Sequence, residues 1–212
     1  MRSSRRWCVD RHMKRNMHGV TRVLLLMLLF SSSACVPDSK NPLTAFDRDA
    51  MDASVYGSWF WKDEHETGYL HFGQEKDSGL LKLMMIELNS SGKIGVTQML
   101  GHTSQLGDSH YLNLKFVPSQ DGISEYIFIK YVISEKGLGL AFMDSAVIEK
   151  AIADKVLAGT VAQKQRVASV RLSDTSKNLQ QFVRENELAL FAEMKFLSKL
   201  VLPTDDSSRA TP

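Results

Sequence analysis

The sequence predicts an α+β fold: an antiparallel β-meander that forms a barrel or a strongly curved sheet, with C-terminal helices packed on it. Two observations support this prediction. Up to residue 143, short segments alternate apolar and polar residues and are separated by turn signals at regular intervals. After residue 143, apolar residues recur at spacings of three and four, which is the period of an amphipathic helix.

Seven β-segments are expected in the first part of the chain, each with one buried and one solvated face. The segment 111–117 alternates most regularly, with Leu112, Leu114 and Phe116 directed inward. Its residues expected to face outward are Tyr111, Asn113 and Lys115. The expected strands are 55–62, 68–73, 80–88, 94–100, 111–117, 124–133 and 138–143.

Two features depart from regular alternation. Lys82 and Glu87 have opposite parity within 80–88, so both can face solvent only if the strand contains a bulge near its centre, at Met84–Met85. The stretch 101–109 is expected to form a loop. The histidines expected to be exposed beside this loop are His102 and His110.

The second part of the chain is expected to contain three helices and one short strand. Asp144 or Ser145 caps the first helix, and Gly159 follows its end. The third helix is expected to stop before Pro203. The expected elements are helix 145–157, strand 167–172, helix 174–184 and helix 188–201.

The residues before Cys35 predict a secretory signal peptide. A basic segment precedes eight apolar residues, 23–30, and small residues follow them up to the cysteine. Eight residues are too few to span a bilayer as a helix, which needs about 20. The basic region is unusually long for a signal. The expected signal peptide is 1–34, with the true start at Met13 or Met17.

This pattern resembles the lipobox of bacterial lipoproteins, whose cysteine is acylated before the signal is removed. The resemblance implies that Cys35 carries fatty acids such as palmitate, each buried methylene contributing about 0.8 kcal/mol to membrane binding. Val36 stands where lipoproteins retained at the inner membrane carry Asp, which implies an outer-membrane location facing the periplasm. Ser32 departs from the aliphatic residue usual in this family. The alternative is ordinary cleavage near Ala34, which leaves Cys35 as a free thiol.

The mature chain is expected to contain one domain. We expect a lipid-anchored tether over 35–52, a single β-rich domain with C-terminal helices over 53–202, and a disordered tail over 203–212. Without the signal, 19 basic and 23 acidic residues remain, so the net charge is about −4 and does not favour nucleic-acid binding. Removal of Cys8 with the signal leaves no internal disulfide, so burial of the core must stabilise the domain.

Gly57-Ser58-Trp59 opens the first expected strand and resembles the Gly-x-Trp motif of lipocalins. The resemblance implies that Trp59 plugs the closed end of a barrel and that Gly57 allows close approach there. It also implies that an Arg from the last strand packs over the indole, with Arg171 the first candidate and Arg166 the second. A lipocalin-like barrel would bind a small apolar molecule. The alternative is a tryptophan that simply packs one end of a β core.

The densest group of metal-ligand types lies in the sequence Asp-Glu-His-Glu at 63–66. The candidate ligands are His65, Glu66 and His71. Their spacing matches no familiar metalloenzyme pattern, and hairpin tips are polar in any case. We therefore expect a solvated hairpin with neither metal nor cofactor.

The chain contains no Gly-x-Ser-x-Gly, no glycine-rich phosphate loop and no Cys-x-x-Cys. We expect a non-enzymatic, lipid-anchored envelope protein that binds either an apolar small molecule or an envelope protein. The alternative is an envelope hydrolase with a site near Asp63–His71. One set of methionines either fills the core or lines an adaptable apolar cavity. These methionines are Met84, Met85, Met99 and Met143.

Overall fold

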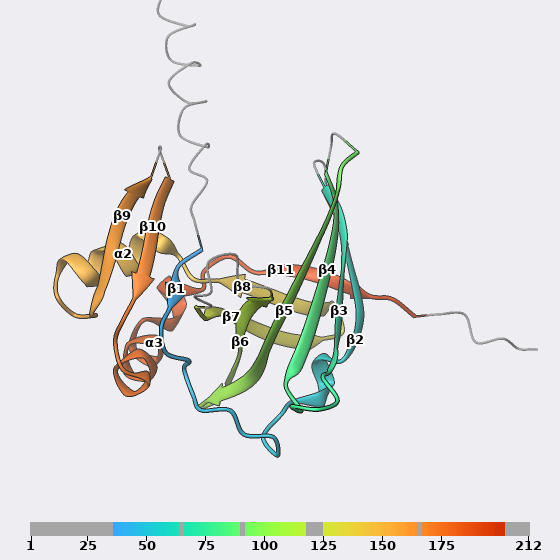
Figure 1. The fold of residues 1–212 in the computed structure, drawn as a ribbon, viewed down its shortest axis with the longest axis horizontal. Helices are drawn as coiled ribbons and strands as arrows, with labels where there is room; N and C mark the ends of the chain where they lie inside the picture. Colours follow the sequence, from blue (N-terminus) through green and yellow to red (C-terminus); the bar gives the residue numbers. More distant parts are fainter. Residues whose placement is uncertain (1–35, 64–65, 90–91, 118–124, 165–166, 202–212) are drawn as a thin grey trace, which may run out of the picture. The chain divides into compact units, whose positions relative to one another are not determined.

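Eight antiparallel strands close into a barrel in the computed structural model (Figure 1). The structure describes residues 36–63, 66–89, 92–117, 125–164 and 167–201. The predicted signal, Cys35, Arg166, His65 and the predicted tail 203–212 lie outside the described residues. The barrel strands are β2 (Gly57–Lys62), β3 (Glu66–Gln74), β4 (Leu81–Asn89), β5 (Ile94–Leu106), β6 (Ser109–Val117), β7 (Ile127–Ser134), β8 (Gly137–Phe142) and β11 (Lys195–Lys199). The fold class predicted from the sequence is confirmed.

The last strand closes the barrel, because β11 pairs with β8 on one side and with β2 on the other. The helix predicted over 188–201 is therefore wrong. Its apolar residues fit a helical spacing, but a seven-strand meander would leave two unpaired edges. The hydrogen bonds that β11 makes with both edges outweigh the local preference of this segment for a helix. Only Leu197 of this strand is buried.

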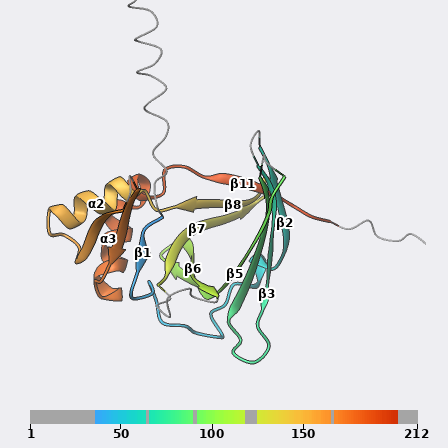
Figure 2. The same cartoon turned by 45° about the horizontal axis from the view of Figure 1, so that its top comes forward.

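A small α/β insertion connects β8 to β11 (Figure 2). Its strand β9 was not predicted, the first helix is shorter than the predicted 145–157, and the second extends past the predicted 174–184. The insertion's strands form a second sheet with β1, which pairs in parallel with β10. The elements of this part are β1 (Asp38–Ser39), α2 (Ser145–Ala153), β9 (Gly159–Lys164), β10 (Val167–Leu172) and α3 (Ser176–Leu190).

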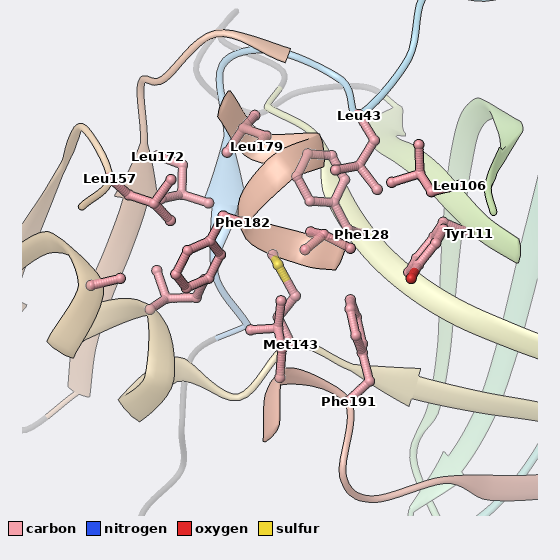
Figure 3. Close-up of a cluster of buried hydrophobic side chains, with 14 of the residues drawn as sticks. Leu43, Leu106, Tyr111, Phe128, Met143, Leu157, Leu172, Leu179, Phe182 and Phe191 are labelled. Atoms are coloured by element: carbon pink, nitrogen blue, oxygen red, sulfur yellow. The ribbon is translucent and has the colours of Figure 1, made fainter. Parts of the chain in front are cut away.

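Two apolar cores result, one inside the barrel and one between the barrel wall and the insertion. Figure 3 shows the outer core, to which Tyr111 and Phe128 of the wall and Phe182 of α3 belong. Tyr111 and Asn113 point away from the barrel interior as expected, but both are buried and do not face water. Strand β6 is therefore buried on both faces over residues 111–114.

Strands β4 and β5 pair without interruption, so the bulge expected near Met84–Met85 is absent and Glu87 keeps its inward parity. The loop expected over 101–109 is also wrong, because β5 continues to Leu106 and only a tight turn precedes β6. Gly101 permits the close pairing of β5 with β6, since a Cβ at this position would collide with the carbonyl oxygen of Asn113 on β6. His102 is consequently buried.

The barrel has two different ends. Strands β2–β3, β4–β5 and β6–β7 connect at one end, which we call the mouth, and β3–β4, β5–β6 and β7–β8 connect at the other, which we call the closed end. The 3-10 helix η1 (Ala53–Val55) packs at the closed end, where Val55 is buried in the inner core. Tyr131 of β7 donates a hydrogen bond to the Asp52 carboxylate that caps η1, at 2.7 Å.

Candidate functional site

Trp59 seals the closed end of the barrel. Its ring is 1% exposed, and its Nε1 donates a hydrogen bond to the carbonyl oxygen of Val55 at 2.9 Å. Gly57, which opens the strand, has a φ of +125°, a conformation that side-chain-bearing residues rarely adopt. Trp59 thus packs at one end of the β core, and the backbone conformation of Gly57, rather than a lack of space, requires glycine there, since a Cβ would meet only Lys199 Cε at 3.5 Å.

The residue over the Trp59 indole is Lys199, not Arg171. The Lys199 ammonium lies 5.3 Å from the ring centroid and comes from β11, the last barrel strand. Arg171 lies on β10, outside the barrel, where its Nε is 3.1 Å from a carboxylate oxygen of Asp38. The hydrogen bond from this guanidinium to Asp38 raises the pKa of Arg171. Sequence reasoning chose an arginine because it did not place the closing strand at β11.

Of the three candidate metal ligands, only His71 has a side chain within the described residues. The described residues contain no group of three or more His, Cys, Asp or Glu side chains that could hold a metal ion. Asp63 lies 3.8 Å from the ammonium of Lys195. The side chain of Glu66 lies outside the described residues, as does His65.

His71 instead forms a hydrogen bond with Ser58, on the outer face of the barrel. The Ser58 Oγ and His71 Nδ1 atoms are 2.6 Å apart, a separation that suits a nucleophile and its base. A hydrolase also needs a group that orients the imidazole. The residue beside His71 on the next strand is Met84, which cannot act as that group. The pair is therefore described best as a cross-strand hydrogen bond.

The barrel mouth carries a rim of aromatic side chains. Phe116 and Phe142 have inward parity on β6 and β8, yet they are 46% and 47% exposed because they lie at the mouth. Trp61, also of inward parity, packs against the inner core and covers Gly68 on the neighbouring strand. The sequence indicated that Phe116 points inward, but its exposure depends on where the barrel ends.

Methionines lie beside this rim. Met99 pairs with Phe116 across β5 and β6 and is buried, and Met85 packs against the same inner core. Of the four methionines singled out in the sequence, these two lie inside the barrel. Met143 belongs instead to the outer core. Unbranched methionine side chains change rotamer at little cost, so the part of the inner core beside Phe116 can adapt its packing.

A second apolar surface lies on the outer face of the hairpin formed by β4 and β5. Leu88 faces Ile94, and Ile86 faces Val96, in consecutive cross-strand pairs. Ile94 and Val96 are 66% and 59% exposed, and Leu88 is exposed as well. These side chains are too many and too contiguous to be the scattered surface apolar residues that any protein carries.

The segment from Ser39 to Asp52, which we call the strap, is bound along the outer wall of the barrel. The N–H of Leu43 donates to the Asn113 carboxamide at 2.7 Å, and His102 Nε2 donates to the Thr44 carbonyl at 2.8 Å. Burial lowers the pKa of His102, which favours the neutral imidazole. The tether expected over 35–52 is therefore wrong beyond its first residues.

The half-buried carboxylate of Glu187 on α3 makes two contacts with the barrel wall, which act as clamps. Tyr111 and Lys130 both bind Glu187 of α3, with the ammonium 3.0 Å from the carboxylate. Burial alone would raise the pKa of Glu187, but hydrogen bonds from Ser109, Tyr111 and Lys130 hold it below its ordinary value. This charged group joins the insertion to the barrel.

No family model, no curated protein and no solved structure matches this chain. Among the described residues, no helix combines the length and the apolar character needed to cross a membrane. Function is therefore inferred from the residues and their geometry.

Proposed function

We propose that this chain is a lipid-anchored envelope protein that binds an apolar small molecule at the barrel mouth and carries out no catalysis. Acyl chains on Cys35 would hold it at the outer membrane, facing the periplasm. The observation that supports the binding role is the pair of half-exposed phenylalanines, Phe116 and Phe142, of which Phe116 lies beside Met99 of the inner core. Apolar side chains at the mouth of a barrel are typical of a small-ligand site.

Native mass spectrometry of the mature protein extracted from membranes tests the binding role. We expect an apolar small molecule to remain bound, and we expect Phe116→Ser combined with Phe142→Ser to lose it. Phe196→Ser is the matched control, because Phe196 is 43% exposed on β11 but lies on the outer face. A ligand retained by the double variant, or a bound protein in place of a small molecule, would overturn the proposal. A covalently labelled Ser58 after treatment with a fluorophosphonate would favour the hydrolase instead.

The anchor has its own test. Cys35→Ser is expected to release the protein from membranes into the soluble fraction, whereas Ser33→Ala, which keeps the cysteine, leaves it bound. Mass analysis of the N-terminal peptide should find fatty acid on Cys35. An unmodified sulfur would contradict the anchor while leaving the ligand experiment to be judged by itself.

A further inference from the structure

The described chain begins at the mouth of the barrel. Ser39 exchanges two backbone hydrogen bonds with Tyr126, at 2.8 and 2.7 Å, and Tyr126 directly precedes β7. Because β7 starts at the mouth, the strap enters the domain there, and Figures 1 and 2 show β1 beside the start of β7. Asp38 is further fixed by its ion pair with Arg171.

Little free chain separates Cys35 from this fixed point. Only Val36, Pro37 and Asp38 lie between Cys35 and Ser39. Four residue steps span at most about 14 Å when fully extended. An acyl chain on Cys35 would therefore hold the mouth, and not the closed end, next to the bilayer.

The hairpin face that borders the mouth has the chemistry of a membrane interface. Two cross-strand rows run over β2 to β5: Phe60, Tyr69, Ile86 and Val96 form the first, and Lys62, Thr67, Leu88 and Ile94 form the second. The first row is apolar and aromatic throughout. The second row has the exposed Lys62 at one end and the exposed aliphatic side chains of Leu88 and Ile94 at the other. Aliphatic residues enter the boundary between headgroups and acyl chains, and lysine favours phosphate headgroups.

We propose that this hairpin face, centred on Leu88, Ile94 and Val96, lies against the phospholipid surface that holds the anchor. The inference rests on the proposed anchor at Cys35, and it adds a defined orientation with a second contact. The occupant is the lipid surface because the short tether brings the mouth to it. A ligand at the mouth would then exchange directly with the bilayer.

Site-specific fluorescence tests the orientation. Once the leader is removed and Cys35 is acylated, an introduced cysteine is the one free thiol of the chain. Val96→Cys carries an environment-sensitive NBD label on the hairpin face. Asp108→Cys carries it at the exposed turn between β5 and β6, at the closed end. The acylated proteins are placed in vesicles of phosphatidylethanolamine and phosphatidylglycerol that contain a doxyl-labelled phosphatidylcholine as quencher.

We expect the label at position 96 to shift to the blue and to be quenched, and the label at position 108 to show neither change. Adding Leu88→Ser and Ile94→Ser should abolish the shift at position 96 while the acyl chains keep the protein on the vesicles. Equal, unquenched emission from both positions of vesicle-bound protein would overturn the docking but not the anchor. A shift in native membranes that is missing in protein-free vesicles would assign the face to a protein partner. Protein with unmodified Cys35 would remove the anchor and the docking together.

Discussion

Asn113 is the residue whose loss should loosen the strap most. Its fully buried carboxamide accepts a hydrogen bond from the N–H of Leu43 at 2.7 Å and donates one to Ser104 Oγ at 2.6 Å. Asn113→Leu removes both bonds and leaves the Leu43 N–H buried without an acceptor. An unsatisfied buried donor costs about 1–3 kcal/mol and a lost hydrogen bond about 1 kcal/mol. We therefore expect the free energy of unfolding to fall by about 3 kcal/mol.

Urea unfolding measures this loss. With a slope of about 2 kcal/mol per molar urea, the midpoint should fall by about 1.5 M without a change of slope. The matched control is Gln98→Leu, on the neighbouring strand β5 and on the same outer face but exposed, which should change stability by no more than about 0.5 kcal/mol. Faster amide exchange over 40–48 should accompany the loss in Asn113→Leu alone. A midpoint shift no larger than the control's would refute the role of the carboxamide in holding the strap.

Three further changes test the barrel and its clamps. The pKa of Glu187 is lower in the folded chain than its ordinary value of 4.5. The ionised carboxylate therefore stabilises the fold fully above pH 4.5, and this stabilisation is lost as the pH falls through the folded pKa. Glu187→Gln should make the urea midpoint decline less steeply below about pH 4.5. Gly101→Ala should force β5 away from Asn113 and lower the melting temperature, because overpacking there costs about 3 kcal/mol of the free energy of unfolding. Leu197→Ala should cost about 2–4 kcal/mol in urea, since Leu197 is the buried residue of the closing strand.

The alternation of apolar residues was sufficient to predict β2 to β8, because each of these strands has an inner face that must be apolar. The closing strand could not be predicted in the same way. Only Leu197 of β11 is buried, so no alternation is visible, and the apolar residues around it happen to fit a helix. What makes β11 a strand is the pair of free edges on β2 and β8, which are distant in sequence.

The residues of the candidate site also divide into those that the local sequence predicts and those that depend on distant strands. Trp59 and Gly57 could be placed at one end of the barrel because their motif is local. Lys199 could not be placed over the indole, since its position depends on the register of β11 against β2. The exposure of Phe116 likewise depends on where neighbouring strands end. A single sequence predicts whether a strand residue points inward or outward, but it does not predict contacts that depend on the pairing of strands distant in sequence.

The path of the strap decides which end of the barrel would face a membrane that holds the proposed anchor, and the strand order alone would give the opposite end. Strand β2 begins at the closed end, so a chain that ran directly from an anchor into β2 would present that sealed end to the membrane. Here the chain first meets the mouth at Ser39, crosses the outer wall through Leu43 and Thr44, and only then forms η1 at the closed end. On the proposed anchor at Cys35, this detour turns the aromatic rim and the hairpin face toward the lipid. Because Ser39 stays bound to Tyr126 when the Leu43 hydrogen bond is lost, Asn113→Leu should leave the free tether short, and the label at position 96 of the acylated protein should remain quenched on the vesicle.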